Sequence, residues 1–467
     1  MSFDYTRFLS QERACLIAPA GYGKTHTIIE CLKCLSGRYL VLTHTHAGVA
    51  ALRDKMSESD IPSARFELTT ISAFGQKISH SYTIEDKIPR QSLNQEDYFR
   101  WLSNRMLELA SNAKIQEVMQ ISYDGVIVDE YQDCTQSQHC FIVSIAKGIP
   151  LWVFGDPLQG IFDFNGPIVD FEKDLNEFKT FSLDTPWRWL ENNEELGRDI
   201  LMIRKALETP PWKIDWSALK TVKRIILDTD DIYSAVPKYC KDGGLDESRL
   251  VITTHKNQRK LVARRFGGRC TIVEPIDDRV FYNASRLVDS LSQRSAMTML
   301  YSLATSLFFK TEVDNWLTCR GVKTKKRDED RLVVQELSSA ITEYLSEPCP
   351  MKLLNCLRAL DRINGIRLLL HDQYFAIRNA IEMSVERGIT VSEAMEKVRN
   401  SVRLRGGRRT GHFMAGTTLL VKGLEFDHVT VVDANPAFDL STYSGRKNFY
   451  VAVSRARKTL TILSKKQ

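Results

Sequence analysis

Two patterns of apolar and polar positions recur along the chain: short apolar runs, and longer segments with helical spacing. Through the first 165 residues, helical segments separate four apolar, β-prone runs, "ACLIAP", "YLVLTH", "GVIVDE" and "LWVFGD". Strands that alternate with helices predict a parallel sheet covered by helices. A later series predicts a second sheet from the runs "TFSLD", "KRIIL", "RLVITT", "AGTTLLV", "VTVVDA" and "LTILSK". The predicted fold class is therefore α/β, with two parallel-sheet domains.

Two stretches interrupt these series with helical periodicity that is almost free of β-type runs. The longer one includes "SRLVDSLSQRSAMTMLYSLATSLFF", and the shorter one includes "EDYFRWLSNRMLELASNAKIQEVMQ". We interpret both as helical insertions. The predicted division is a first sheet domain in residues 1–84 and 121–178, a short insertion in 85–120, a second sheet domain in 179–284 and 406–467, and a helical insertion in 285–405.

Composition restricts the class of protein only weakly. The chain has 467 residues, of which 43% are hydrophobic, enough to fill two or more domains. The net charge of +6 permits a polyanionic partner such as nucleic acid, but a mildly basic protein without one has the same balance. No apolar stretch approaches the roughly 20 residues of a membrane helix, and the first residues lack the pattern of a signal peptide. We therefore expect a cytoplasmic protein with no membrane partner.

The stretch "APAGYGKT", which begins at Ala18, lies between a predicted strand and a predicted helix, the context of a phosphate-binding loop. Gly21 and Gly23 let backbone N–H groups approach phosphates, and the N-terminus of the helix favours an anion. Lys24 can reach the terminal phosphates, and the Thr25 hydroxyl can bind Mg²⁺. Ala18 replaces the first glycine of the usual pattern, at a position that only needs to be small. The stretch therefore predicts a site for a nucleoside triphosphate with Mg²⁺.

Two acids at the end of an apolar strand supply a second part of such a site. In "GVIVDEYQD", the predicted strand ends at Asp129 and Glu130. The Asp129 carboxylate suits Mg²⁺, and Glu130 can act as the base for the attacking water. Acids at a strand end can also be solvated loop charges, but a phosphate loop upstream favours the catalytic interpretation. Together the two motifs predict a Mg²⁺-dependent nucleoside triphosphatase.

In this context, seven ordered segments resemble the motifs of superfamily 1A helicases, the family of the UvrD, Rep and PcrA type. In chain order they are "VLTHTHAGVAALRDKM", "TTISAFGQ", "VDEYQDCTQSQ", "VFGDPLQGIFDFNG", "LDTPWRW", "TTLLVKGLEFDHVTVV" and "NFYVAVSRARKTL". Their order and approximate spacing match along nearly the whole chain. The resemblance implies ATP as the nucleotide and two RecA-like P-loop domains, 1A and 2A. It also implies that the helical insertions are the 1B and 2B subdomains, although the first is much shorter than is typical.

The resemblance gives further residues a role at the nucleotide. Gln159 would contact the γ-phosphate, and Arg188 and Arg455 would act as arginine fingers that stabilise charge on the transferring phosphoryl group. The other implied nucleotide contacts are adenine stacking by Trp187, adenine recognition by Gln11, ribose binding by Glu425, and a contact at Gly423.

The nucleic-acid side departs further from the family. The resemblance implies that Phe164 stacks on a base, whereas core packing and ligand contact stay equally open for Phe162. Thr43 and Thr417 are further predicted nucleic-acid contacts. Three positions carry residues other than those common in the family, namely His44, Ser72 and Leu419. These changes leave open whether the protein grips DNA strongly enough to unwind it.

Two functions are consistent with this resemblance. The first is an ATP-dependent helicase or translocase on single-stranded DNA, with the 3′ to 5′ direction of the family, which couples hydrolysis to movement or unwinding. The second is an ATPase subunit that senses single-stranded DNA or DNA ends and regulates a nuclease, with little processive unwinding. Small helicase-like proteins of this second kind resemble the partners of OLD-family nucleases in Gabija-type antiviral defence.

Overall fold

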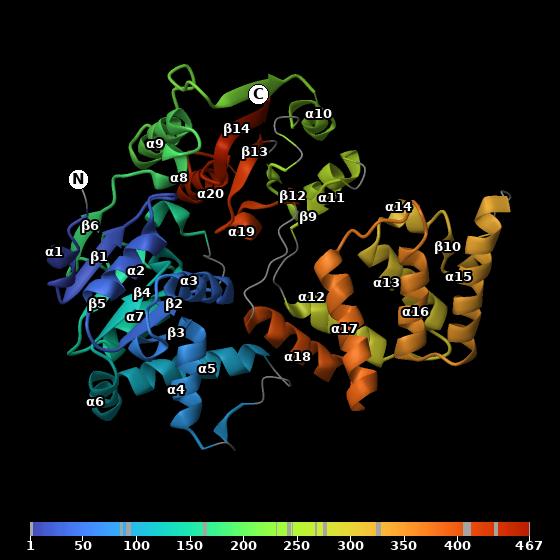
Figure 1. Cartoon of the computed structure of the whole chain (residues 1–467), viewed down its shortest axis with the longest axis horizontal. Helices are drawn as coiled ribbons and strands as arrows, with labels where there is room; N and C mark the ends of the chain where they lie inside the picture. The colour runs from blue at the N-terminus through green and yellow to red at the C-terminus, as the bar shows by residue number, and fades with distance from the viewer. Residues whose placement is uncertain are drawn as a thin grey trace. The chain divides into compact units, whose positions relative to one another are not determined.

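The structure, a computed structural model, forms two compact units (Figure 1). Unit 1 comprises Met1–Thr254 and Val421–Gln467, and unit 2 comprises His255–Leu420. The residues that the structure describes are 3–84, 87–89, 95–161, 166–229, 231–240, 244, 246–266, 269–273, 278–323, 328–404, 412–433 and 438–466.

A six-stranded sheet in unit 1 has the order β3-β2-β4-β5-β1-β6, and every neighbouring pair is parallel. Its strands are β1 (Arg13–Ile17), β2 (Tyr39–Thr43), β3 (Phe66–Thr70), β4 (Gly125–Val128), β5 (Leu151–Gly155) and β6 (Lys179–Ser182). The helices of this part are α1 (Tyr5–Leu9), α2 (Lys24–Cys34), α3 (His46–Glu58), α4 (Ile71–Ser81), α5 (Gln95–Ala110), α6 (Ala113–Ser122) and α7 (Gln136–Ile145).

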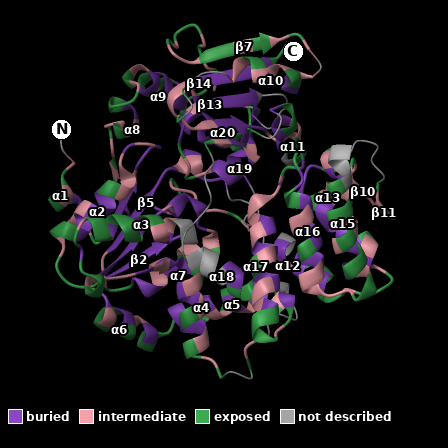
Figure 2. Cartoon of the chain, turned by 45° about the vertical axis from the view of Figure 1, so that its right-hand side comes forward, coloured by how far each residue is buried: buried purple, intermediate pink, exposed green. Residues whose placement is uncertain are grey.

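Each face of this sheet has its own core, because successive strand residues point to opposite faces. On β1, Ala14 and Leu16 pack with α1, α2 and α3, whereas Cys15 packs with the cluster that holds α4 to α7. Figure 2 shows β2 and β5 in the colour of buried residues. The sheet is therefore covered by helices on both faces, which explains why its strands read as continuous apolar runs.

The predicted short insertion contains α5 and α6. Tyr98, Leu102 and Met106 on α5, and Ile115 and Met119 on α6, are buried in the same cluster as α4 and α7. The two helices therefore extend the helical layer of the first sheet and share its core.

The second sheet has the order β7-β14-β13-β8-β12-β9. Its strands are β7 (Lys223–Leu227), β8 (Arg249–Ile252), β9 (Thr271–Ile272), β12 (Phe413–Gly416), β13 (Phe426–Asp433) and β14 (Ala456–Lys465). The pairs β7–β14, β14–β13, β13–β8 and β12–β9 are parallel. The helices of this part are α8 (Trp187–Leu190), α9 (Glu194–Glu208), α10 (Ile232–Tyr239), α11 (Lys256–Arg265), α19 (Thr418–Val421) and α20 (Tyr443–Val453). Two parallel six-stranded sheets confirm the predicted α/β fold class with two RecA-like domains.

One strand lies in a different sheet from the one predicted. We expected "TFSLD" in the second sheet, but β6 pairs in parallel with β1, from Ala14–Lys179 to Ile17–Ser182. The expectation is therefore wrong for this strand. The physical reason is that local sequence determines whether a segment is extended, whereas the free hydrogen-bonding edge of β1 determines where it pairs.

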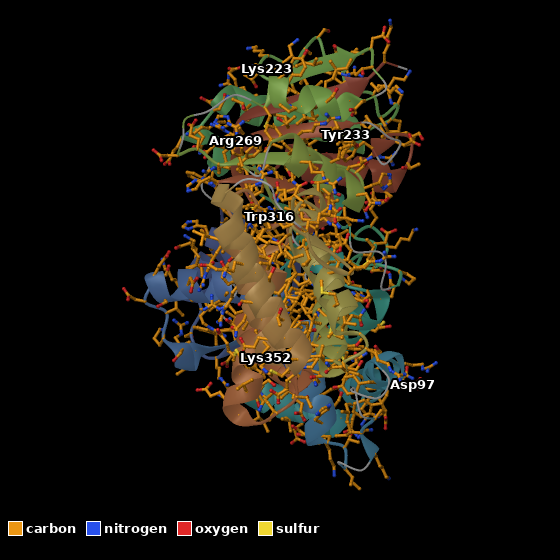
Figure 3. All side chains as sticks on the ribbon, turned by 90° about the vertical axis from the view of Figure 1, so that its right-hand side faces the viewer. Asp97, Lys223, Tyr233, Arg269, Trp316 and Lys352 are labelled. Atoms are coloured by element: carbon orange, nitrogen blue, oxygen red, sulfur yellow. The ribbon has the colours of Figure 1, made fainter. Side chains whose placement is uncertain are left out.

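Unit 2 holds a helical core. Its helices are α12 (Asp278–Asp289), α13 (Ala296–Leu307), α14 (Lys310–Val313), α15 (Asp328–Ser346), α16 (Pro350–Asp361), α17 (His371–Arg387) and α18 (Val391–Leu404), with a small antiparallel pair β10 (Leu317–Thr318) and β11 (Gly321–Val322). Their apolar residues form one cluster, in which Leu300, Leu357 and Ile381 are buried. Trp316, labelled in Figure 3, packs partly buried against this cluster. The predicted helical character of this stretch is confirmed, while the domain boundaries stay a prediction.

Among the described residues, no helix is both long enough and apolar enough to cross a membrane.

Candidate nucleotide site

The predicted phosphate loop joins the carboxyl end of β1 to the first turn of α2. Gly21 and Gly23 have φ angles of 80° and 86°, a left-handed backbone that favours glycine. Ala18 is buried, and its N–H donates to the Gly155 carbonyl at 2.9 Å. Because α2 begins at Lys24, its first N–H groups have no partner within the helix and face the loop. The loop therefore has the backbone that an anion site requires.

Lys24 lies against the two acids that follow β4. Its Nζ is 2.7 Å from Asp129 Oδ1 and also pairs with Glu130. Burial by itself lowers the pKa of Lys24, but the two carboxylates raise it above its usual value. Burial acts to raise the pKa of Glu130, yet the ammonium groups of Lys24 and Lys422 hold it at about 2. Lys24 is therefore cationic and Glu130 is ionised near neutral pH.

The Glu130 side chain is positioned by an uncommon backbone conformation and by a hydrogen bond from a buried amide. Glu130 has a φ of 56°, which is uncommon for a residue with a side chain. The Nε2 of Gln132 donates to the Glu130 carboxylate, and its Oε1 accepts from the Asp156 N–H at 3.0 Å. These contacts restrict the Glu130 side chain to one region of the site.

Asp129 and Thr25 are the predicted Mg²⁺ ligands. Thr25 follows Lys24 in the first turn of α2, and the Asp129 carboxylate contacts Lys24. Mg²⁺ commonly takes one or two protein oxygens and completes its shell with substrate phosphates and water, so this small donor set fits the ion. Within the described ranges, no group of three or more His, Cys, Asp or Glu side chains could hold a metal.

Residues from the C-terminal part of the chain meet at Gln159. Its Oε1 accepts a hydrogen bond from Arg455 Nη2 at 3.2 Å, and its Nε2 donates to Asp156 Oδ2 at 2.8 Å. Lys422 Nζ donates to the backbone carbonyl of Gln159 at 2.6 Å and to Asp133 Oδ1 at 2.6 Å. The structure thus brings Gln159 and Arg455 together and adds Lys422 to them, while their roles at a phosphate stay a prediction.

Both predicted arginine fingers are largely buried. Arg455 donates to the Val451 carbonyl at 2.9 Å and to Ser454 Oγ at 2.8 Å, and burial, with the charge of Arg188, lowers its pKa to about 10. Arg188 pairs with Glu425 at 2.5 Å. The buried Nε of Arg188 has no hydrogen-bond partner in the described part of the chain. An unpaired buried donor is costly, so this N–H is suited to an anionic ligand.

The residues predicted to contact the adenine and ribose lie in different surroundings. Trp187 is 60% exposed, and its ring lies against the loop, because a Cβ on Gly23 would be 3.0 Å from it. Gly423 has a φ of 81°, a left-handed backbone conformation that favours glycine at this position. The Gln11 amide donates to the Arg7 carbonyl at 3.2 Å, so this side chain is engaged at the end of α1.

The predicted nucleic-acid contacts are less well defined. Phe162 and Phe164 lie outside the described residues. Thr43 ends β2, is fully buried, and its hydroxyl has no partner among the described residues. The Nε2 of His44 is also buried without a described partner, and burial, with the charge of Lys422, lowers the pKa of His44 to about 4. Thr417 is buried in unit 2.

Sequence reasoning assigned no role to four charged residues that the structure places at or behind the site: Asp133, Asp156, Arg204 and Lys422. Three of them, Asp133, Asp156 and Lys422, lie in motifs in which neighbouring residues are the predicted catalytic or binding ones. Arg204 had a signal of its own, because it stands on the apolar face of α9 beside Ile200 and Ile203. A charged residue on the buried face of a helix needs a partner.

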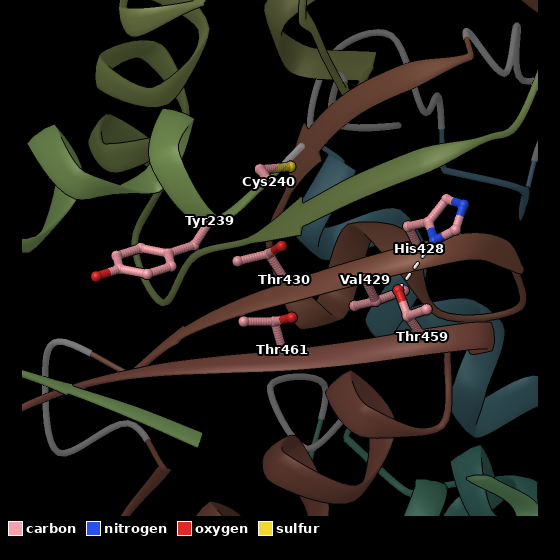
Figure 4. A pocket seen from close by; sticks show the side chains of 7 residues that line it. All are labelled: Tyr239, Cys240, His428, Val429, Thr430, Thr459 and Thr461. Carbon is pink, nitrogen blue, oxygen red and sulfur yellow. Dashed lines mark hydrogen bonds between the residues drawn. The ribbon is translucent and has the colours of Figure 1, made fainter. Parts of the chain in front are cut away.

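A small cavity elsewhere in unit 1 is formed by the end of α10 and by β13 and β14 (Figure 4). Its free volume of about 10 Å³ is enough for one water molecule. The His428 ring contacts Thr459 Oγ1 at 2.9 Å beside it. This cavity is too small for a nucleotide.

Two protein-family models match the chain. Residues 6–165 match an AAA domain, and residues 348–464 match the viral superfamily 1 RNA helicase core domain. No curated protein matches the sequence. The structure is similar to two solved structures of the Arterivirus helicase, nonstructural protein 10. The complex with DNA has a TM-score of 0.36 and 11% identity, and covers 96% of this chain and 60% of that one. The second structure has a TM-score of 0.37 and 10% identity, with 96% and 59% covered.

The chain thus spans about 60% of the length of these solved structures. The two family matches cover the phosphate loop with its acidic motif and the C-terminal part of the chain, which contains Lys422 and Arg455. Together with the site in which these parts meet, they support a superfamily 1 helicase-like nucleoside triphosphatase.

Proposed function

We propose that the protein is an ATP-dependent superfamily 1A translocase or helicase that moves on single-stranded DNA in the 3′ to 5′ direction. The observation that carries the proposal is the meeting of residues from both sheet domains at Gln159. Arg455 contacts its side chain and Lys422 contacts its backbone. Hydrolysis then requires both domains to be in place, so turnover can drive a change in their arrangement.

In this proposal each residue of the site has one task. Lys24 exchanges its carboxylate partners for the terminal phosphates, and ionised Glu130 takes a proton from the attacking water. Gln159, Arg188 and Arg455 stabilise charge on the transferring phosphoryl group. Mg²⁺, when bound by Asp129 and Thr25, neutralises phosphate charge.

The nucleoside would lie on the side of Trp187. The exposed indole offers a face for the adenine, and Glu425 would bind the ribose after releasing Arg188, its present partner at 2.5 Å. That exchange would free Arg188 for the phosphates when the ribose arrives. Gln11 and Gly423 remain candidate nucleotide contacts.

On the nucleic-acid side, Phe164 is proposed as a base platform, with Phe162, Thr43 and Thr417 as further contacts. Because the Thr43 hydroxyl is fully buried, it would have to become exposed before it could bind a nucleic acid.

The test is ATP hydrolysis measured without nucleic acid and with single-stranded DNA, duplex DNA with free ends, and RNA. RNA is included because one matching family model describes an RNA helicase core. We expect single-stranded DNA to stimulate hydrolysis most. The Glu130→Gln variant is the control, since it should bind nucleotide without turnover. An ATPase that no nucleic acid stimulates would refute the translocase.

The burial of Thr43 and the presence of His44 beside it favour a second candidate, an ATPase subunit that regulates a nuclease and unwinds little. The partner implied by the family resemblance is an OLD-family nuclease in antiviral defence. Affinity purification from the native host tests this candidate. A stoichiometric nuclease supports it, whereas robust duplex unwinding by the isolated protein with no such partner rejects it.

A further inference from the structure

A buried ion pair lies directly behind Gln159, and none of the tasks above uses it. Asp156 is fully buried and Arg204, on α9, is nearly so. Arg204 Nη1 is 2.9 Å from both carboxylate oxygens of Asp156, and Arg204 also pairs with Glu208 at 2.8 Å. A buried ion pair adds little to stability, because desolvation offsets much of the attraction. The pair therefore calls for another explanation.

Asp156 determines which way the Gln159 amide points. Its Oδ2 accepts from Gln159 Nε2 at 2.8 Å. An ionised carboxylate only accepts hydrogen bonds, so it selects the NH₂ group of the amide and excludes the oxygen. The amide oxygen then faces Arg455, which donates to it at 3.2 Å. In this orientation one N–H of Gln159 remains available to donate to an anionic ligand.

Arg204 makes this arrangement compatible with a phosphate. A carboxylate behind the amide would repel the γ-phosphate, and the guanidinium of Arg204 offsets that charge from 2.9 Å. Glu208, the other partner of Arg204, has a partly exposed side chain, so water screens its charge. Asparagine in place of Asp156 would need no cation, but its side chain can donate or accept, so the orientation of the Gln159 amide would then depend on Arg455 alone, at 3.2 Å.

The same arginine is linked to the phosphate loop. Its Cζ lies 5.0 Å from the centroid of the Tyr450 ring. The Tyr450 hydroxyl accepts from the Ala20 N–H at 3.3 Å, and burial raises the pKa of Tyr450, which keeps the phenol neutral. Through Tyr450, the buried Arg204 side chain thus connects Asp156, which contacts Gln159, with the loop that would hold the phosphates.

We propose that Asp156 and Arg204 are positioning residues for γ-phosphate recognition: Asp156 orients the Gln159 amide as a donor, and Arg204 neutralises Asp156. The inference rests on the proposed ATP hydrolysis.

The test compares wild type with the double variant Asp156→Asn/Arg204→Met, which removes both charges together and leaves neither unpaired. We expect kcat to fall about tenfold to a hundredfold with little change in the affinity for ADP, and the affinity for a non-hydrolysable ATP analogue to fall about tenfold. Adding Gln159→Ala to the double variant should lower kcat little further, because the pair acts through Gln159. Should the double variant not fold, Asp156→Asn alone carries the same expectations, since Arg204 keeps Glu208 as a partner.

Asp199→Asn is the matched control. Asp199 is a buried carboxylate on the same helix, but it accepts from the Thr221 N–H at 2.7 Å. Its loss should lower stability and leave kcat unchanged. Wild-type kcat in the double variant, or a further full loss on adding Gln159→Ala, overturns the inference. A wild-type protein without ATPase activity refutes the proposed function instead.

Discussion

The ion pair between Lys422 and Asp133 allows a quantitative prediction. Lys422 Nζ lies 2.6 Å from Asp133 Oδ1, and both side chains are nearly inaccessible to solvent. Replacing Lys422 by Met leaves a buried carboxylate without its cation. Removing one partner of a buried pair costs about 3–5 kcal/mol when the other stays charged.

The cost should depend on pH, because the carboxylate can take up a proton instead. Burial raises the pKa of Asp133 to about 6 even with Lys422 beside it. An acid whose pKa is raised in the folded state loses stability as pH rises from the unfolded pKa to the folded one. In wild type this loss ends near pH 6. At about 1.4 kcal/mol per pKa unit, a cost of 3–5 kcal/mol moves the folded pKa of the variant to about 8–10, so its loss of stability continues to that pH.

The assay is urea unfolding of Lys422→Met and wild type at pH 5 and pH 9. At pH 5 the Asp133 carboxyl is largely protonated in both proteins. Their free energies of unfolding should then differ by only about 1–2 kcal/mol, which comes from the lost hydrogen bonds. At pH 9 we expect about 3–5 kcal/mol. The double variant Lys422→Met/Asp133→Asn is the control and should differ from wild type equally at both pH values. An equal difference at both pH values for Lys422→Met would refute the reasoning.

Three further predictions concern single residues. Arg455→Ala should lower kcat on the order of a thousandfold while nucleotide still binds, as measured by single-turnover hydrolysis and by titration; a loss under tenfold contradicts its role as a finger. Gly23→Ala should weaken ATP binding, because alanine at a φ of 86° costs about 1–2 kcal/mol and its Cβ would meet the Trp187 ring at 3.0 Å; calorimetric titration with unchanged affinity would be the contrary result. His44 has a lowered folded pKa of about 4, so its contribution to stability is fully present above about pH 6.5 and is lost as pH falls towards 4. His44→Gln should therefore reduce the acid loss of stability by at most about 3 kcal/mol, measured by urea unfolding across this pH range, and an unchanged acid loss would be the contrary result.

Much of the fold was predictable because its signals are local. Runs such as "YLVLTH" and "GVIVDE" became β2 and β4, since a strand buried on both faces must be apolar at every position. The helical stretch after residue 285 was equally clear from its spacing. The pairing of β6 with β1 was not predictable, because a strand carries no local mark of the edge that it joins.

The residues of the candidate site were likewise predictable only where their signals are local. Ala18 to Thr25, Asp129 and Glu130 were predictable, because each motif places its chemistry within a few consecutive residues at the end of a strand. The burial of the Thr43 hydroxyl was not, since it depends on how α3 packs over β2.

The sequence by itself determined the α/β class, the phosphate loop and the acidic motif, because strand runs and short motifs are set by neighbouring residues. Only the tertiary structure decided which charges pair. Lys422 and Asp133 are 289 positions apart, and Arg204 and Asp156 are 48 apart. Burial makes these pairs necessary, because a charged group removed from water is strongly destabilising unless a group of opposite charge lies beside it in the folded chain.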